Sequence, residues 1–218
     1  MPQSDVVARA RERGVTEVLH FTTHVGLAGV LADGAVHSRD QLKVSEYLES
    51  LVVYNSPDRS RDRDWTNYVN LSLSRVNIRM LNSSVRWHED LWFAVLAFDV
   101  GILGHDGVQF ATTNNAYESK VKRGPGLEGF EEIFGPRIPW GPYSSVHYRT
   151  ADMPTNLPTD PQAEILYPES VSIDHLRAIY VRDAEHLGEI AAFRAAFDRT
   201  SPHDLSQVSV EHNPSVFV

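Results

Sequence analysis

Apolar and polar positions alternate along the chain in a way that predicts short strands. In Tyr68–Ser74, Val69, Leu71 and Leu73 fall on one face and Asn70, Ser72 and Ser74 on the other, which indicates a half-buried strand. Residues 92–98 form a nearly continuous apolar run, typical of a central strand. Further strands are predicted at 15–22, 107–112, 163–167, 176–181 and 207–210.

Helical spacing appears in three other segments. One helix is predicted at 5–13, ending at Gly14, and a second at 25–31, ending before Gly34. A third follows Asp183 as its N-cap, with apolar positions at 187, 190, 193 and 197. Segment 46–54 fits either a helix or a strand, and 57–64 is a charged loop. Without repeats or a clear boundary, this pattern predicts one α+β domain over 1–218.

Periodicity is lost between about Glu118 and Pro161. This stretch holds many Gly and Pro residues, together with Trp140 and Tyr143. Irregular segments of such length in a compact domain are usually functional. We therefore expect 118–161 to serve a binding or catalytic role.

The composition of the chain excludes several classes of chemistry and of binding partner. The chain has no cysteine, which excludes disulfides and thiolate chemistry, and its polar start is unlike a secretory signal, so we expect a cytoplasmic protein without membrane contact. The net charge of −9 argues against tight nonspecific nucleic-acid binding. Basic residues are nevertheless clustered at 59–63 and 120–123, so that one face could handle a phosphate-bearing substrate.

Glu164 is the leading catalytic candidate. It opens the apolar strand 163–167 directly after the irregular segment. A carboxylate at the mouth of a strand, beneath a long loop, is well placed to orient a ribose hydroxyl or to accept a proton. The alternative is an ordinary glutamate at a sheet edge.

The other polar candidates each allow a functional and a purely structural interpretation. His20 and Thr22 could contact a ribose or carboxamide, or His20 could be a satisfied core histidine. The arginines Arg59, Arg61 and Arg63 could grip phosphates through paired donors, or pair with neighbouring aspartates. The ten histidines show no metal-binding spacing, and dinucleotide-binding, P-loop and hydrolase signatures are lacking, so we expect no metal.

Taken in order, these elements resemble the DarT family between His20 and Tyr167. His20-Phe21-Thr22 with Leu27 and Gly34 is similar to the family's opening strand and helix. Asn55-Ser56-Pro57-Asp58-Arg59 is similar to its Asn-Asp-x-x-Arg element, with Ser56 departing from the pattern. Further matches are Ser72-x-Ser74-x-x-Asn77-x-x-Met80, Gly107-Val108-Gln109-Phe110 with Asn114-Asn115-Ala116, and Gln162-Ala163-Glu164.

The resemblance implies an ADP-ribosyltransferase fold, with a mixed β-sheet core, flanking helices and a long turn-turn loop at 118–161 that presents the target. It implies that NAD is the co-substrate and single-stranded DNA the acceptor, with Glu164 and Arg59 catalytic. NAD-contacting residues would be His20, Phe21, Thr22, Gly26, Leu27, Asn55, Arg59 and Ser72. DNA-contacting residues would be Arg61, Arg75, Arg79, Trp140, Tyr143, His147 and Tyr148. The loop aromatics would stack on bases, or alternatively pack to shape the loop.

The Ser-x-Ser-x-x-Asn-x-x-Met stretch is closer to the guanine-modifying branch of the family than to its thymine-modifying branch. The family also implies a macrodomain-bearing antitoxin as a partner. Two other readings stay open on sequence alone. One is an NAD-dependent enzyme that modifies RNA or protein, and the other is a nucleotide-binding module without turnover.

Overall fold

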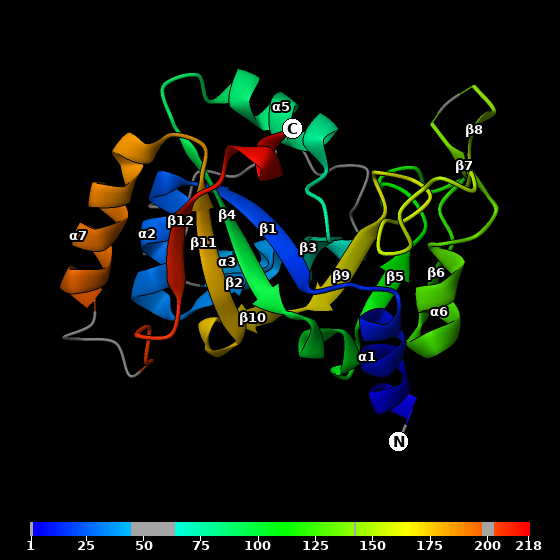
Figure 1. The fold of residues 1–218 in the computed structure, drawn as a ribbon, viewed down its shortest axis with the longest axis horizontal. Helices are drawn as coiled ribbons and strands as arrows, with labels where there is room; N and C mark the ends of the chain where they lie inside the picture. The colour runs from blue at the N-terminus through cyan, green and yellow to red at the C-terminus, as the bar shows by residue number, and fades with distance from the viewer. Residues whose placement is uncertain (1, 45–63, 142, 198–202) are drawn as a thin grey trace.

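A mixed eight-stranded sheet runs through the computed structural model, which describes residues 2–44, 64–141, 143–197 and 203–218 (Figure 1). β11 and β12 are parallel and every other neighbouring pair is antiparallel. In spatial order the strands are β12 (Ser209–His212), β11 (Leu176–Val181), β4 (Phe93–Asp99), β1 (Glu17–Thr23), β3 (Tyr68–Leu73), β9 (Glu164–Pro168), β5 (Gln109–Ala111) and β6 (Arg123–Pro125).

The sheet divides into two halves between β1 and β3. β1 pairs with β4 along its whole length, from Glu17 to Thr23. It pairs with β3 only at Val18↔Leu73 and Leu19↔Ser72. Beyond Leu19 the two strands separate, so the polar side chains of His20 and Asn70 lie where backbone pairing has stopped.

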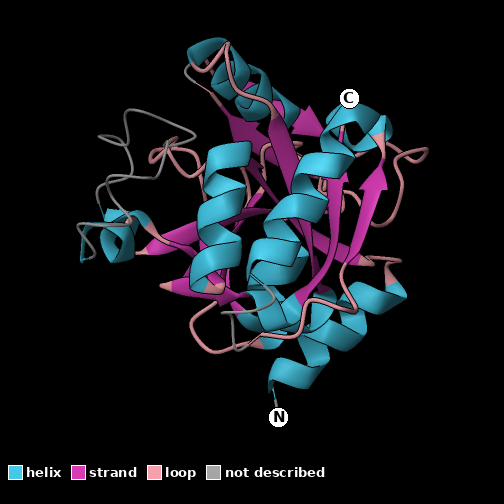
Figure 2. Ribbon diagram, turned by 90° about the vertical axis from the view of Figure 1, so that its left-hand side faces the viewer, coloured by secondary structure: helices cyan, strands magenta, loops and turns pink. Residues whose placement is uncertain are grey.

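Alternate residues of β4 enter two cores on opposite faces of the sheet, as expected for a strand buried on both sides. The larger core takes side chains from α1 (Pro2–Glu12), α2 (His24–Asp33), α6 (Gly126–Glu132) and α7 (Leu187–Phe197). The smaller core lies under α5 (Ile78–Trp87) and the terminal turn η5 (Pro214–Phe217). Figure 2 shows helices packed side by side in front of the sheet, where α2 and α7 are in contact.

Most predicted elements are confirmed within a few residues of their expected bounds. α2 ends at Asp33, and Gly34 after it has a φ of 84°, in the left-handed region that glycine adopts readily. Asp183 makes no capping hydrogen bond and precedes a short turn, η4 (Ala184–His186), so its predicted N-cap role is wrong. The segment 46–54 and most of the charged loop 57–64 lie outside the described residues.

Several further elements were not predicted, among them one amphipathic helix, α5, that begins after its N-cap Asn77. They are α5, β2 (Ala35–His37), β10 (Ser170–Ser172), α3 (Arg39–Val44), η2 (Val100–Gly104) and η3 (Ile173–His175). β2 pairs with β10 as a separate two-stranded sheet. Among the described residues, no helix has the length and apolar character needed to cross a membrane.

The segment 118–161 contains more regular structure than its sequence indicates. Its first part forms β6 and α6, and Phe130, Ile133 and Phe134 are buried in the larger core. The prediction of one long irregular loop is therefore wrong for this part, because sparse apolar residues between glycines hide a short strand and a short helix. The remainder carries a two-stranded hairpin, β7 (Arg137–Trp140) and β8 (Ser145–Tyr148), which pairs only with itself among the described strands.

Candidate active site

Glu164 is the first residue of β9 and is only 8% exposed. Its Oε2 accepts a hydrogen bond from Asn70 Nδ2 at 3.0 Å and another from the backbone N–H of Asn115 at 2.9 Å. Hydrogen bonds from two different elements fix the plane of the carboxylate, and fixing one oxygen also fixes the direction of the other. Glu164 is therefore a preorganised carboxylate and not a loosely held glutamate at a sheet edge.

His20 joins this group through Asn70. Its Nδ1 lies 3.1 Å from the carbonyl oxygen of Asn70, which can only accept a hydrogen bond, so Nδ1 carries the proton. Burial lowers the pKa of His20 to about 4, against a smaller opposing contribution from this hydrogen bond. At neutral pH the ring is therefore uncharged, and its Nε2 is an acceptor. We call His20, Asn70, Asn115 and Glu164 the carboxylate floor.

The start of α2 lies beside His20. Thr23 caps the helix by accepting a hydrogen bond from Gly26 N–H at 3.1 Å. A Cβ added at Gly26 would lie 2.2 Å from Thr22 Oγ1, so the close approach of the two residues requires glycine. The Leu27 side chain is fully buried in the larger core, so its predicted contact with NAD would involve the backbone.

Phe21 points to the opposite face of β1 from His20 and Thr22, as strand alternation requires. Its ring packs in the smaller core beside Phe93, with ring centroids 6.3 Å apart. The Phe21 ring also lies beside the ring of His20, with centroids 6.3 Å apart and nearly parallel planes. A contact of Phe21 with NAD stays a prediction.

The Ser-x-Ser-x-x-Asn-x-x-Met stretch forms a turn and a helix cap. Ser72 Oγ accepts a hydrogen bond from Asn77 N–H at 3.2 Å, and Asn77 Oδ1 accepts one from Met80 N–H at 3.1 Å. Ser72 and Asn77 are buried, and Asn77 is the N-cap of α5. The spacing of this stretch is thus explained by local hydrogen bonds that start a helix.

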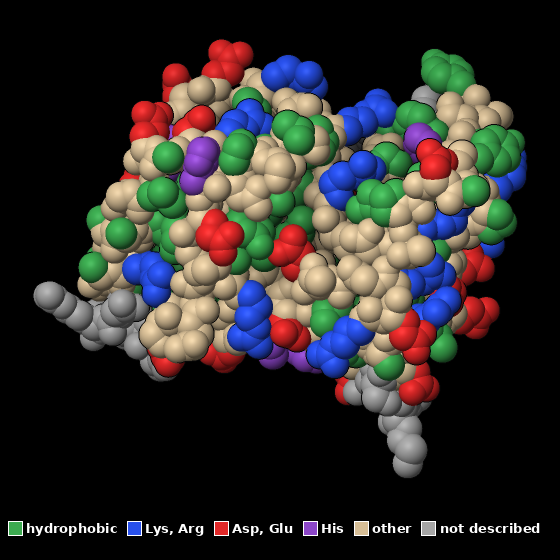
Figure 3. Space-filling view, in the orientation of Figure 1, with side chains coloured by type: hydrophobic (Ala, Val, Ile, Leu, Met, Phe, Trp, Pro, Cys, Tyr) green, Lys and Arg blue, Asp and Glu red, His purple; other side chains and the backbone are tan. Residues whose placement is uncertain are grey.

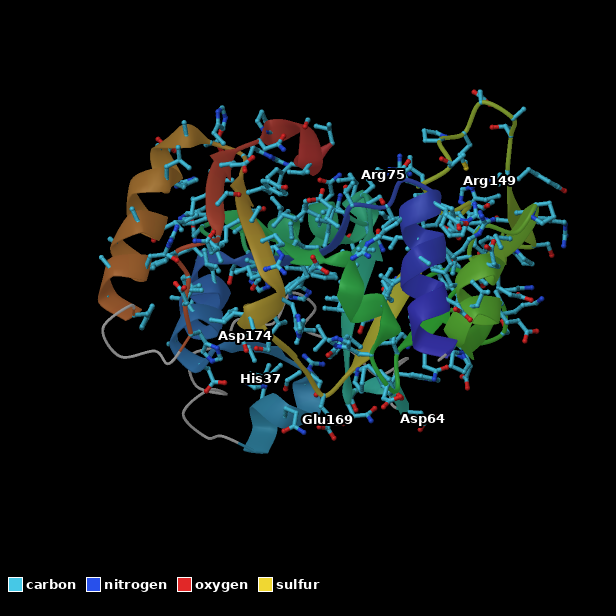
Figure 4. The ribbon with its side chains drawn as sticks, turned by 60° about the horizontal axis from the view of Figure 1, so that its bottom comes forward. His37, Asp64, Arg75, Arg149, Glu169 and Asp174 are labelled. Atoms are coloured by element: carbon cyan, nitrogen blue, oxygen red, sulfur yellow. The ribbon has the colours of Figure 1, made fainter. Side chains whose placement is uncertain are left out.

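That cap directs Arg79, in the first turn of α5, toward the β7–β8 hairpin. The Arg79 guanidinium lies 5.4 Å from the centroid of the Trp140 ring, within range of a cation–π contact. Arg75 and Arg79 are both exposed. Figure 4 shows Arg75 and Arg149 at one side of the molecule, away from His37 and Asp174.

The predicted loop aromatics divide into two kinds. Trp140 and His147 stack on each other across the hairpin, with centroids 4.9 Å apart, and shape it. Tyr143 and Tyr148 are 89% and 62% exposed. At the base of the hairpin, His147 Nε2 lies 3.9 Å from Asp160 Oδ1, and burial raises the pKa of the Asp160 carboxyl. Packing within the hairpin therefore explains Trp140 and His147, whereas the exposed rings of Tyr143 and Tyr148 are available to a ligand.

Charged side chains of both signs cover this part of the molecule, in a chain whose net charge is −9. Figure 3 shows Lys and Arg side chains over the right-hand half of the view, where β5, β6 and α6 lie, with acidic side chains interspersed among them. Asn55, Arg59 and Arg61 lie outside the described residues. Within the described ranges, no three His, Asp or Glu side chains are grouped so as to hold a metal ion.

Two residues of the carboxylate floor, Asn70 and Asn115, were not predicted as site residues. Asn70 lies on the polar face of the strand that the alternation identified, and Asn115 lies in a matched family motif. Neither pattern reveals that both donors converge on one oxygen of Glu164, because that depends on how three strands are aligned.

The mixed sheet with its flanking helices is the fold of the NAD-dependent ADP-ribosyltransferases of the DarT family. A family model described as DarT, ssDNA thymidine ADP-ribosyltransferase, matches residues 19–218. The chain therefore belongs to the DarT family. No curated protein matches it.

Solved structures confirm the fold. DarT of Thermus sp. 2.9 in complex with ADP-ribosylated ssDNA superposes with a TM-score of 0.65 at 13% identity, over 94% of this chain and 97% of that one. The same protein in complex with NAD+ gives 0.60 at 14% identity, over 93% and 98%. Thermosipho africanus DarTG in complex with ADP-ribose gives 0.61 at 16% identity over 93% of this chain, which spans only 51% of that one.

Proposed function

We propose that the protein transfers ADP-ribose from NAD to a base of single-stranded DNA, with Glu164 as the catalytic carboxylate. The observation that carries this proposal is the carboxylate floor, in which two donors hold a buried glutamate in one orientation. Family membership and the Thermus sp. 2.9 DarT complexes with NAD+ and with ADP-ribosylated ssDNA support the choice of substrates.

The chemistry follows from the charge that develops during transfer. As the bond between nicotinamide and ribose breaks, positive charge builds on the sugar, and a fixed carboxylate stabilises that charge more than a mobile one does. Glu164 would also align a ribose hydroxyl. As the bond to nicotinamide breaks, a nitrogen of the base forms the new bond to the anomeric carbon. Neutral nicotinamide leaves, and the proton of that nitrogen passes to Glu164 or to water. Neutral His20, through Nε2, would accept a hydrogen bond from the carboxamide or a ribose hydroxyl.

The remaining predicted contacts fit this arrangement as proposals. Thr22 and the glycine at position 26 would line the NAD site beside His20, and Ser72 would support it from the start of the α5 turn. Arg59, with Asn55, would hold the pyrophosphate or assist catalysis, and Arg61 and Arg75 would contact DNA phosphates. Tyr143 and Tyr148 would stack on bases, which single-stranded or extruded DNA exposes.

For the acceptor base we propose guanine. The Ser-x-Ser-x-x-Asn-x-x-Met stretch supports this, as does Arg79, because a guanidinium can donate to O6 and N7 of guanine together. The family model's description favours thymine instead. The two bases are distinguished by mass spectrometry of short oligonucleotides that differ in one base, after incubation with the protein and NAD.

The test of the general function uses labelled NAD with DNA, RNA and protein as separate acceptors. We expect label in DNA and release of nicotinamide, both abolished in Glu164→Gln. Label in RNA or protein alone would replace the DNA proposal, and NAD binding without nicotinamide release would replace the enzymatic one. A control, Arg86→Lys on the exposed side of α5, should behave as wild type.

We further propose a macrodomain-bearing antitoxin as a partner that removes the ADP-ribose. The likeness to the longer Thermosipho africanus DarTG chain supports this proposal. A macrodomain hydrolase added to the modified oligonucleotide should release ADP-ribose and restore the original mass. An unchanged mass would argue against reversal by this class of enzyme.

A further inference from the structure

The backbone N–H of Asn115 donates to Glu164, as Asn70 does, and it belongs to the connection between β5 and β6. The position of a backbone N–H in such a connecting segment depends on the conformation of the whole segment. Asn115 is 1% exposed, so water does not compete for it. Whatever fixes Asn115 therefore also fixes the carboxylate.

Arg123, the first residue of β6, holds Asn115 at two points. Its Nε donates to Asn115 Oδ1, and its terminal nitrogen donates to the Asn115 carbonyl at 2.9 Å. The guanidinium thus binds the side chain and the main chain of the same residue with a planar fork, a geometry that lysine cannot reproduce.

Sheet register explains why Arg123 can reach Asn115. Ala111 on β5 pairs with Glu164 on one side and with Arg123 on the other. Residues paired across neighbouring strands point to the same face of a sheet, so Glu164, Ala111 and Arg123 form a row. The small alanine between them leaves room for the long arginine side chain to extend toward the connection that contacts Glu164.

Arg123 also contacts the segment that leads to the second donor. Its guanidinium lies 4.8 Å from the centroid of the Trp65 ring, and Trp65 packs against Tyr68, the first residue of β3, at 5.1 Å. β3 carries Asn70, which donates to the same oxygen of Glu164. One side chain is therefore in contact with both segments that orient the carboxylate.

From these contacts we infer that Arg123 is a positioning residue for Glu164, acting through Asn115 and without touching substrate. This inference rests on the proposed function, because it assigns Arg123 a role in the reaction of that carboxylate. The bound NAD would meet Glu164 in one orientation only while the fork is intact.

The test compares Arg123→Lys with wild type in NAD-dependent modification of an oligonucleotide. A displacement of the carboxylate by a fraction of an ångström to 1 Å lowers kcat by about 10- to 100-fold, because only aligned groups stabilise the transition state. KM for NAD should change by less than about threefold, since the binding surface is retained. In Arg123→Ala, added guanidinium ion should restore part of kcat.

The matched control is Arg194→Lys. Arg194 also uses two nitrogens, which donate to the carbonyls of Val208 and Leu205, but it lies on α7, outside the proposed site. It should lower the unfolding temperature by a similar amount and leave kcat unchanged. Equal losses of kcat in the two variants would overturn the inference and indicate a purely structural arginine.

Asn115→Ala provides an independent measurement, because it removes Oδ1 and keeps the backbone donor. It should lower kcat, though by no more than Arg123→Lys does, because the hydrogen bond from Arg123 to the Asn115 carbonyl is retained. The double variant should be little worse than Arg123→Lys, since both changes weaken the same contact between Arg123 and Asn115. Fully additive losses would contradict the inference. If Arg123→Lys keeps wild-type kcat while Glu164→Gln is inactive, the inference about Arg123 fails and the proposed function stands. If wild type releases no nicotinamide, the proposed function fails.

Discussion

The carboxylate floor and the β7–β8 hairpin are two regions of one proposed site, and they are built in opposite ways. The floor lies on strands of the eight-stranded sheet, and the described contacts of its polar groups cross between elements. The hairpin pairs only with itself among the described strands and exposes two tyrosines. A reacting group needs a rigid support, whereas a surface that selects substrates can vary without disturbing it.

The largest expected effect comes from Glu164→Gln, which breaks the floor at its centre. The amide keeps the size of the side chain but cannot supply the negative charge that stabilises the ribosyl cation. We expect kcat to fall by about 10³-fold, the scale seen when one electrostatic contributor to a transition state is removed. Steady-state release of nicotinamide measures this, and an unchanged unfolding temperature separates the effect from misfolding. A residual rate within tenfold of wild type would contradict the assigned role.

The second prediction tests how strongly the folded protein shields His20 from water. It uses the pH dependence of the free energy of unfolding. Burial lowers the pKa of His20 from 6.5 to about 4, so the unfolded chain takes up a proton at higher pH than the native one does. Stability that is present above pH 6.5 is therefore lost as the pH falls from 6.5 to about 4, by up to about 3 kcal/mol.

Urea unfolding between pH 7 and pH 4 measures this loss. His20→Gln should lack the His20 contribution, so its stability should fall less steeply over the window. The control is His212→Gln, an exposed histidine outside the floor, which should follow the wild-type curve. Parallel curves for wild type and His20→Gln would show that folding does not lower the pKa of His20.

A smaller effect is expected from Asn70→Ala, which removes one donor to Glu164 and keeps the carbonyl that accepts from His20. A hydrogen bond to a charged group contributes about 1.5–3 kcal/mol, so kcat should fall by about 10- to 100-fold. Asn67→Ala, an exposed asparagine just before β3, is the control. If kcat is retained in Asn70→Ala, the hydrogen bond from Asn70 is not required to orient the carboxylate.

The same two regions differ in how well the sequence predicts them. Alternating and continuous apolar runs predict β3, β4 and β9, and therefore the strand position of Glu164. The roles of Asn115 and Arg123 beside Glu164 depend on the strand register that aligns Glu164, Ala111 and Arg123. They could not be predicted, because register between strands distant in sequence leaves no local pattern. In 118–161 the glycines and prolines indicated a loop, although Phe130 and Phe134 belong to the core.

The resemblance to the family indicated the enzyme class, which periodicity alone does not. The structure then showed where the individual residues of the matched motifs lie. The resemblance correctly indicated the fold and the class of enzyme. It placed Phe21 and Leu27 at the NAD site, and these contacts stay predictions: the Leu27 side chain is buried in the larger core and the Phe21 ring packs against the smaller one. Ser72 and Asn77 are buried, hydrogen-bonded parts of the turn before α5.

The smallest effect is predicted for the exposed tyrosines of the hairpin, and it isolates substrate recognition from chemistry. Stacking of a base on an aromatic ring is worth about 1–3 kcal/mol, so Tyr143→Ala or Tyr148→Ala should raise KM for the oligonucleotide by about 5- to 100-fold. Slow hydrolysis of NAD in the absence of DNA should be unchanged, because the floor does not depend on these side chains. Tyr143→Phe and Tyr148→Phe keep the ring and should restore KM. A fall in NAD hydrolysis in the alanine variants would instead show that the hairpin supports the floor, and the two regions would then act as one unit.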